Sequence, residues 1–171
     1  MDLREIVSAR QQKARDFAAE KHEGQFRKGS GEPYAVHPQR VADILESYGA
    51  SEPVLCAAEL HDCVEDTDTE VNDILDLIDS EVAELVSEVT NAPDLDGLEK
   101  EVYMSRKLVN LTDDALTIKL GDMLYNLLDK PKPDQVKRMR KNLEYLMEWR
   151  DLNELQLELV QAFEMGSAHY H

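Results

Sequence analysis

Four ionisable side chains lie within six residues of a largely apolar stretch, LCAAELHDCVEDT. They are His61, Asp62, Glu65 and Asp66. If the stretch is helical, residues four apart share a face, so the four side chains form one compact polar patch. Burying several carboxylates is very costly unless they are paired or bind a metal ion. The stretch is therefore a candidate metal or catalytic site. The alternative is a solvated helix end, although acids at that end oppose the helix dipole.

A second polar group interrupts another apolar stretch, ALTIKLGDMLYNLL, at Lys119, Asp122 and Asn126. A helix that is apolar nearly all round is central in its fold. The spacings of three and four residues place these polar side chains on one face. Gly121 in mid-helix costs about 1 kcal/mol relative to alanine, which suggests close approach by another element. A buried ion pair between Lys119 and Asp122 is the alternative to a site here.

His37 stands at the end of a glycine-rich loop, directly before Pro38. Alone, a histidine at a helix entrance is most often a cap or a surface residue. Combined with the His-Asp pair at 61–62 and with Asp122, it gives two imidazoles and two carboxylates. That set suits Mn²⁺, Fe²⁺ or Zn²⁺ with positions left for water. The two acids one turn after the His-Asp pair could orient or deprotonate that water.

Prolines, glycines and helix-capping residues divide the chain into helical segments that would position these groups. We expect helices over residues 2–22, 38–49, 53–67, 70–77, 81–90, 98–110, 113–129 and 134–164. The chain has no strand-like alternation of useful length and no internal repeat. The prediction is an all-α bundle of about eight helices, with one domain over 1–165. The tail GSAHYH, 166–171, is expected to be disordered, and His169 and His171 are excluded from the site.

Length and charge limit the classes of function. The 171 residues suit one domain with a real core, and the formal net charge is −17. So acidic a protein repels nucleic acid polymers and anionic membranes, and it repels phosphorylated molecules unless cations offset the field locally. The segment 21–40 has the opposite charge balance, with more basic than acidic residues. It holds Lys21, Arg27, Lys28 and Arg40 against Glu23 and Glu32. Chance variation along an acidic chain is the alternative explanation for this balance.

The chain lacks the features of a membrane or secreted protein. No apolar run is long enough to cross a bilayer, and the charged N-terminal residues lack the apolar region of a secretory signal. Cys56 and Cys63 would lie about 10 Å apart on one helix, too far for a disulfide. We therefore expect a cytoplasmic protein with two reduced core cysteines.

The combined motifs resemble a known family. They are AAEKHEGQFRKGSGEPYAVHPQRVADIL, AAELHDCVEDT, VTNA and IKLGDMLYNL. They are similar to the HD-superfamily hydrolase domain of the RelA/SpoT homologues, and especially to the single-domain small alarmone hydrolases. The similarity covers about residues 14–128 and a plausible final helix. It implies an all-helical HD fold and one Mn²⁺ held by His37, His61, Asp62 and Asp122.

The resemblance also implies a reaction. Glu65 and Asp66 would activate the water that removes the 3′-pyrophosphate of guanosine tetra- or pentaphosphate (ppGpp or pppGpp), giving GDP or GTP and pyrophosphate. The nucleotide would be bound by Arg27, Lys28, Ser30, Lys119, Asn126 and Tyr145, with core packing as the alternative for Tyr145. We expect Lys119 also to balance charge near Asp122. The length leaves no room for a synthetase domain, so a hydrolase alone is expected.

Two departures from the family pattern leave the substrate open. Gly29 is inserted in the RKGSGEPY loop, which could displace the following serine, and Leu128 stands where the family often has an arginine. Another nucleotide is therefore an alternative substrate: the 2′-phosphate of NADPH, an adenosine alarmone or a dNTP. A non-catalytic nucleotide sensor is the remaining alternative, but it would not need water-activating acids. The sequence does not predict the oligomeric state.

Overall fold

The protein was analysed as a computed structural model that describes residues 8–170. Helices form all the regular structure within this range, and pairing of β type is limited to one isolated bridge between Phe26 and Pro33. The prediction of an all-α fold is confirmed. In chain order the elements are α1 (Ala9–Lys21), α2 (Val36–Ser47), α3 (Glu52–Leu60), α4 (Cys63–Asp66), α5 (Val71–Leu77), α6 (Ser80–Val89), η2 (Leu95–Gly97), α7 (Lys100–Asn110), α8 (Asp113–Leu128), α9 (Pro133–Trp149) and α10 (Glu154–Ser167).

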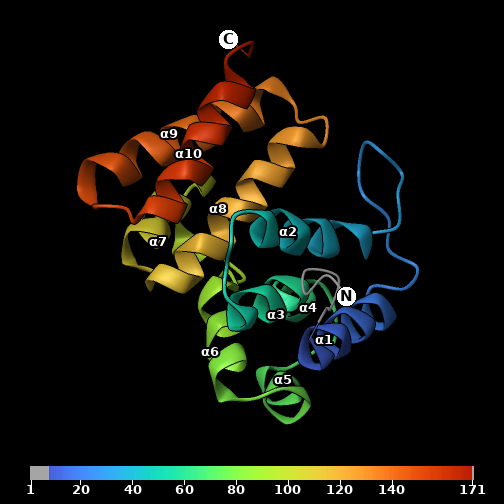
Figure 1. Cartoon of the computed structure of the whole chain (residues 1–171). Helices are drawn as coiled ribbons and strands as arrows, with labels where there is room; N and C mark the ends of the chain where they lie inside the picture. Colours follow the sequence, from blue (N-terminus) through green and yellow to red (C-terminus); the bar gives the residue numbers. More distant parts are fainter. Residues whose placement is uncertain (1–7, 171) are drawn as a thin grey trace.

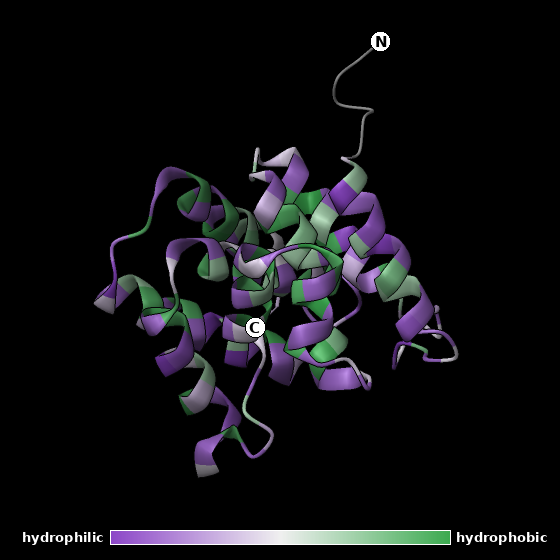
Figure 2. Ribbon diagram, turned by 90° about the horizontal axis from the view of Figure 1, so that it is seen from below, coloured by the Kyte–Doolittle hydropathy of each residue, from purple (hydrophilic) through white to green (hydrophobic). Residues whose placement is uncertain are grey.

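Helix α8 is the centre of the bundle, as its apolar sequence predicts. It runs between α2 and α3 on one side and α10 on the other (Figure 1). Helix α1 packs on α3, α5 on α6, and α7 on α9. Hydrophobic and hydrophilic residues alternate along the outer helices (Figure 2), which is the pattern of helices with one buried face.

The crossing of α2 and α8 depends on Gly121. A β-carbon at this position would lie 2.7 Å from Cδ2 of Leu45, which is too close for any real contact. The absence of a side chain therefore lets the two helices approach closely. This is the close approach that the mid-helix glycine predicts. It brings α2, which carries His37, next to α8, which carries Asp122.

The expectation of one helix over 53–67 is wrong, because a turn at His61 and Asp62 interrupts the helix and separates α3 from α4. The carbonyl of Ala58 accepts the backbone N–H of His61 at 3.4 Å and its imidazole Nδ1–H at 2.6 Å. A carbonyl occupied in this way does not continue the regular ladder of the helix. Glu65 and Asp66 follow on the single turn of α4.

The expectation of one helix over 134–164 is also wrong. Residues 150–153 separate α9 from α10, and Asn153 caps α10 by accepting from the backbone N–H of Gln156 at 2.9 Å. The helix then continues through Ser167, so the predicted disorder is wrong for residues 166 and 167. Arg140 donates to the carbonyls of Ser167 and Tyr170, which ties this end to α9.

Other boundaries shift by a few residues. Helix α2 begins at Val36, so His37 lies in its first turn instead of just before it. Helix α1 is described from Ala9 onward, and the earlier part of the expected helix lies outside the described residues, as does His171. Cys56 and Cys63 are buried free thiols, as predicted. Over residues 8–170, no helix has the length and apolar character needed to span a bilayer.

Candidate metal centre and active site

Four side chains from three parts of the chain converge at the centre of the bundle. His37 comes from α2, His61 and Asp62 from the break between α3 and α4, and Asp122 from α8. His37 Nε2 lies 2.9 Å from Asp122 Oδ1 and 3.4 Å from Asp62 Oδ2. His61 Nε2 lies 3.2 Å from Asp62 Oδ2 and 3.4 Å from Asp122 Oδ1. The structure thus brings together the four predicted metal ligands.

The bonding of His61 fits a metal ligand. Its Nδ1 donates to the carbonyl of Ala58, which leaves Nε2 as the nitrogen with a lone pair. That Nε2 is buried and has no hydrogen-bond partner within residues 8–170. Ligand atoms of His37, His61 and Asp122 lie within 4.8 Å of one another, close enough to share one ion. A divalent cation would give the orphaned nitrogen its partner, so the residues fit a metal.

The carboxylates make this cluster attractive to positive charge. Burial alone would lower the pKa of His61, but Asp62 and Asp122 outweigh it and raise that pKa well above its ordinary value. Burial alone would raise the pKa of each aspartate, but the two histidines outweigh it and lower both. Tyr34 donates its hydroxyl to Asp62 Oδ2 at 2.8 Å and so holds that carboxylate in place. The same field that favours a proton here favours a metal cation.

The two acids on α4 have the properties of proton acceptors. Burial raises the pKa of Glu65, although the Asn91 N–H that donates to its Oε1 and the charge of Lys119 oppose the shift. Burial, followed by the charge of Asp62, raises the pKa of Asp66. A carboxylate with a raised pKa is a better base toward water than an exposed one. These positions therefore suit water activation.

A cavity of about 480 Å³ opens beside Asp122, which is one of its lining residues. The loop after α1, the α6–α7 connection, and helices α7, α8 and α9 contribute to its wall. Six cations line it, against the carboxylates of Asp122 and Asp129. They are Arg27, Lys28, Lys100, Lys119, Lys130 and Arg138. In a chain with a net charge of −17, this local excess of positive charge suits a ligand with several phosphates.

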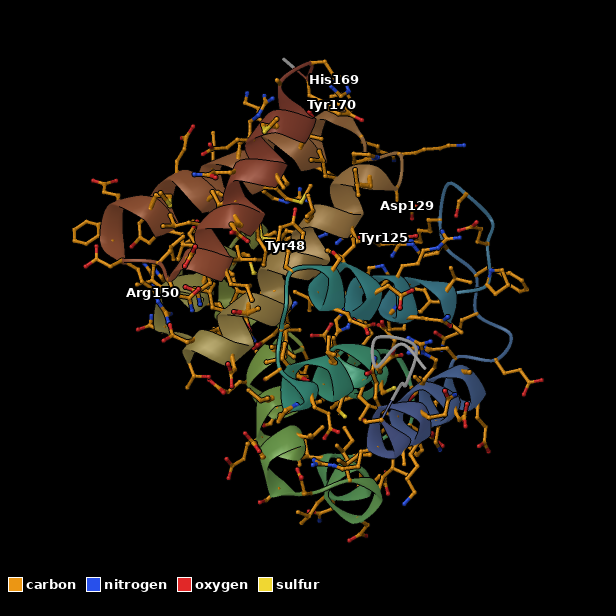
Figure 3. All side chains as sticks on the ribbon, viewed as in Figure 1. Tyr48, Tyr125, Asp129, Arg150, His169 and Tyr170 are labelled. Carbon is orange, nitrogen blue, oxygen red and sulfur yellow. The ribbon has the colours of Figure 1, made fainter. Side chains whose placement is uncertain are left out.

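Four of the predicted nucleotide-binding residues line this cavity: Arg27, Lys28, Lys119 and Asn126. The Arg27 guanidinium donates to Asp129 Oδ2 at 3.0 Å and to Asn126 Oδ1 at 3.2 Å. Asn126 Nδ2 in turn donates to Asp122 Oδ1 at 3.4 Å. Figure 3 shows Asp129 near the end of α8, on the side toward the loop that carries Arg27. A hydrogen-bonded series therefore connects this loop to the metal cluster.

Two predicted nucleotide contacts are not brought to the cavity. Ser30 Oγ accepts the backbone N–H of Glu32 at 3.3 Å, and the Tyr145 ring packs 6.1 Å from that of Trp149. Neither Ser30 nor Tyr145 is among the residues that line the cavity. Leu128, the second departure from the family pattern, is 63% exposed and also lies outside the cavity wall.

Lys119 reaches the cavity but does not have the partner that the sequence suggests. Its Nζ donates to Asn91 Oδ1 at 3.5 Å, and its charge acts on Glu65. The carboxylate of Asp122 is instead balanced by the two histidines. The expected charge balance between Lys119 and Asp122 is therefore replaced by one between Lys119 and Glu65.

Sequence reasoning missed several residues of the site. Tyr34 stands three residues before His37, so its proximity to the ligands could have been inferred from the start of α2. Asn91 belongs to the VTNA motif, but no sequence signal connects it to Glu65. The cations of α7, α9 and the α8–α9 connection join the cavity only through tertiary packing. They are Lys100, Lys130 and Arg138.

An all-α bundle that buries a His-Asp dipeptide between a further histidine and a further aspartate is a helical metal-binding domain. The HD domain family matches residues 14–149, and the chain belongs to that family.

Two relatives in this family carry the name of one enzyme activity. A human protein named guanosine-3′,5′-bis(diphosphate) 3′-pyrophosphohydrolase MESH1 is 43% identical over 119 residues, which are 68% of this chain and 66% of the human protein. A guanosine-3′,5′-bis(diphosphate) 3′-pyrophosphohydrolase of Aquifex aeolicus is 39% identical, and the match spans 17% of its length. The match thus spans slightly less than two thirds of the human relative and a small part of the bacterial one.

A solved structure agrees over nearly the whole chain. It is described as a metazoan orthologue of SpoT that hydrolyses ppGpp and plays a role in starvation responses. It superimposes with a TM-score of 0.76 at 31% identity and covers 94% of this chain and 97% of its own. Together with the relatives, it confirms the resemblance to RelA/SpoT-homologue hydrolase domains.

Proposed function

We propose that the protein is an alarmone hydrolase that uses Mn²⁺ to remove the 3′-pyrophosphate of ppGpp or pppGpp, releasing GDP or GTP and pyrophosphate. The observation that carries this proposal is that Asp122 belongs both to the metal-ligand cluster and to the wall of a cation-lined cavity. A phosphate bound there would lie beside the metal ligands. The relatives named for this reaction and the solved structure described as hydrolysing ppGpp support the same substrate.

The residues divide the chemistry between them. A divalent ion held by His37, His61, Asp62 and Asp122 would polarise a phosphoryl oxygen and lower the pKa of a bound water. Glu65, held by the Asn91 N–H, takes a proton from the attacking water, and Asp66 beside it shares in orienting that water. The water oxygen bonds to the phosphorus next to the ribose, and the bond from that phosphorus to the 3′ oxygen breaks. The 3′ oxygen takes a proton from solvent, pyrophosphate leaves, and Glu65 returns its proton to solvent.

Arg27 is prepared for nucleotide binding before the ligand arrives. Its guanidinium lies 5.8 Å from the ring centre of Tyr34 and 5.9 Å from that of Tyr125, and Asp129 and Asn126 fix its orientation. A fixed planar cation loses little entropy when it binds a phosphate or a purine face. Lys28 and Lys119, which also line the cavity, would add positive charge. Ser30 and Tyr145 have no role in the proposal, because they do not line the cavity.

The proposal keeps a small nucleotide as the partner and the cytoplasm as the compartment. Neither nucleic acid polymers nor membranes fit the strongly negative overall charge.

A substrate panel tests this proposal. The protein is stripped of metal with a chelator, reloaded separately with Mn²⁺, Fe²⁺ and Zn²⁺, and incubated with ppGpp, pppGpp, NADPH, an adenosine alarmone and a dNTP. The proposal predicts pyrophosphate release from the guanosine alarmones, fastest with Mn²⁺, and no turnover after chelation. Orthophosphate release from NADPH with inert alarmones would instead assign the second substrate class.

A further inference from the structure

The short loop after α6 holds the Glu65 carboxylate. The backbone N–H of Asn91 donates to Glu65 Oε1, and the side-chain carbonyl of Asn91 accepts from Lys119 Nζ at 3.5 Å. The position of the Glu65 carboxylate therefore depends on where the chain places the backbone of Asn91. A loop backbone is mobile unless other contacts fix it, and small displacements of a catalytic group reduce rates strongly.

Two side chains of α7 fix the loop on either side of Asn91. Lys107 Nζ donates to the carbonyl of Thr90 at 2.7 Å, and the Tyr103 hydroxyl accepts the backbone N–H of Ala92 at 2.8 Å. Lys107 and Tyr103 also contact each other, with Nζ 3.4 Å from the hydroxyl and 5.5 Å from the ring centre. The residue before Asn91 and the residue after it are therefore both anchored to one turn of α7.

The anchor has an energetic cost to the fold. Burial, followed by repulsion from Lys119, lowers the pKa of Lys107 to about 8, although Glu65, Asp96 and Glu88 oppose this. Burial and Lys119 disfavour the charged form of Lys107, so keeping this side chain charged at neutral pH costs free energy. Such costs are typical of functional sites, where strain is accepted for the sake of geometry.

We propose that Lys107 and Tyr103 are positioning residues for the hydrolytic reaction, holding the Thr90–Ala92 backbone so that the Asn91 N–H fixes Glu65. The inference rests on the proposed role of Glu65 in activating water. Neither residue belongs to the metal cluster, and the sequence motifs assign neither to the site. Tyr103 also lines the cavity, and its part in the anchor is the hydrogen bond that its hydroxyl accepts from Ala92.

The test uses Tyr103→Phe, which removes one oxygen, and Lys107→Met, which keeps the length of the side chain. Each variant is predicted to lower kcat about fivefold to tenfold, with KM and bound metal within about twofold of the parent. Tyr48→Phe and Lys137→Met change the same residue types away from the cavity wall, and both should keep the parental kcat. If Lys107→Met does not fold, the kcat of Tyr103→Phe alone still tests the proposal.

A double-mutant cycle with Glu65→Gln separates positioning from general loosening of the fold. If the anchor acts through Glu65, adding Tyr103→Phe to Glu65→Gln should leave the residual single-turnover rate unchanged. The same fold loss in both backgrounds would overturn the proposal. So would parental kcat in both α7 variants while Glu65→Gln alone is inactive, and that result would leave the proposed function intact. Full turnover by Glu65→Gln would refute the role of Glu65, and the anchor with it.

Discussion

At the scale of single residues, the two nitrogens of His61 have different roles. Nδ1 donates to the carbonyl of Ala58, which both ends α3 and fixes the tautomer, and Nε2, beside Asp62 and Asp122, has no hydrogen-bond partner among residues 8–170. The same hydrogen bond therefore shapes the backbone and prepares the ligand. Glu65 lies one helical turn later, on α4, and its proposed role is to act on water and not to bind the metal.

This division of roles predicts that ligand and base variants behave differently. Asp62→Ala should lower metal occupancy and turnover together, because it removes one of the four ligands and one of the two carboxylate charges that attract the cation. Glu65→Ala should keep the metal and lose at least about a hundredfold in kcat, the usual contribution of a general base. Metal analysis and kcat on the same samples check this. Full activity in both variants would contradict the assignment of Asp62 as a metal ligand and Glu65 as the base.

The individual ligand residues were the part of the site that the sequence predicted best. Ligand types are chemically restricted, so His37, His61, Asp62 and Asp122 stand out against an apolar background. Partners that act through a backbone group, such as the Asn91 N–H on Glu65, have no residue-type signature, and so they were missed. The nucleotide contact at Tyr145 stays a prediction: the residue lies outside the cavity wall and its ring packs near Trp149, and an aromatic residue on an amphipathic helix suits packing as well as stacking.

At the scale of elements, the α3–α4 break and the α2–α8 crossing assemble the site. Helix periodicity predicted where helices lie, but it continued α3 through His61 because the residues on both sides suit a helix. Gly121 indicated a close approach on α8, whereas its partner Leu45 became known only from the structure. The separation of α9 and α10 could have been predicted from Asn153 and Gln156, which form a capping box.

The α1–α3 contact contains a buried charge that makes folding depend on pH. Glu59 is 1% exposed, and Arg15 donates to its Oε1 at 2.8 and 3.0 Å. Burial raises the pKa of Glu59 above its unfolded value even though Arg15 opposes the shift. The folded state therefore binds this proton more readily than the unfolded state, and ionising Glu59 lowers stability as pH rises through the folded pKa.

Removing the cation should make this dependence steeper. Arg15→Met is predicted to destabilise the protein by about 3 kcal/mol at pH 7.5, because it leaves an unpaired buried carboxylate. The loss should shrink toward pH 5, where Glu59 in the variant takes up a proton and needs no cation. Denaturant unfolding at both pH values checks this, with Lys21→Met, from an exposed pair with Asp68, as the control. An equal loss at both pH values would contradict the account of Glu59.

At the scale of the whole molecule, the distribution of charge has a functional consequence. The chain carries 36 acidic and 19 basic residues, yet six basic side chains line one cavity. An acidic exterior around a basic cavity disfavours polyanions such as nucleic acids while still admitting a small phosphorylated ligand. No single sequence segment contains this feature, because the cations come from five separate regions and only the folded bundle brings them together.

The cations far from the predicted loop should contribute to substrate binding. Lys100→Met and Arg138→Met are each expected to raise KM for ppGpp about threefold to tenfold and to change kcat less than twofold, since both line the cavity but neither belongs to the metal-ligand cluster. Lys137→Met, an exposed neighbour on α9, is the matched control. Steady-state kinetics at two salt concentrations check this, because loss of a phosphate contact also weakens the dependence of KM on salt. A fall in kcat at constant KM would contradict it.

The proposed function requires the His-Asp cluster and its adjoining cavity to direct water to the phosphorus nearest the ribose 3′ oxygen. The most direct test is to incubate the Mn²⁺-loaded protein with ppGpp in heavy-oxygen water and to analyse both products by mass. The proposed reaction gives GDP without the label and pyrophosphate carrying one labelled oxygen. Label in GDP, release of orthophosphate as the first product, or no turnover with Mn²⁺ would contradict it.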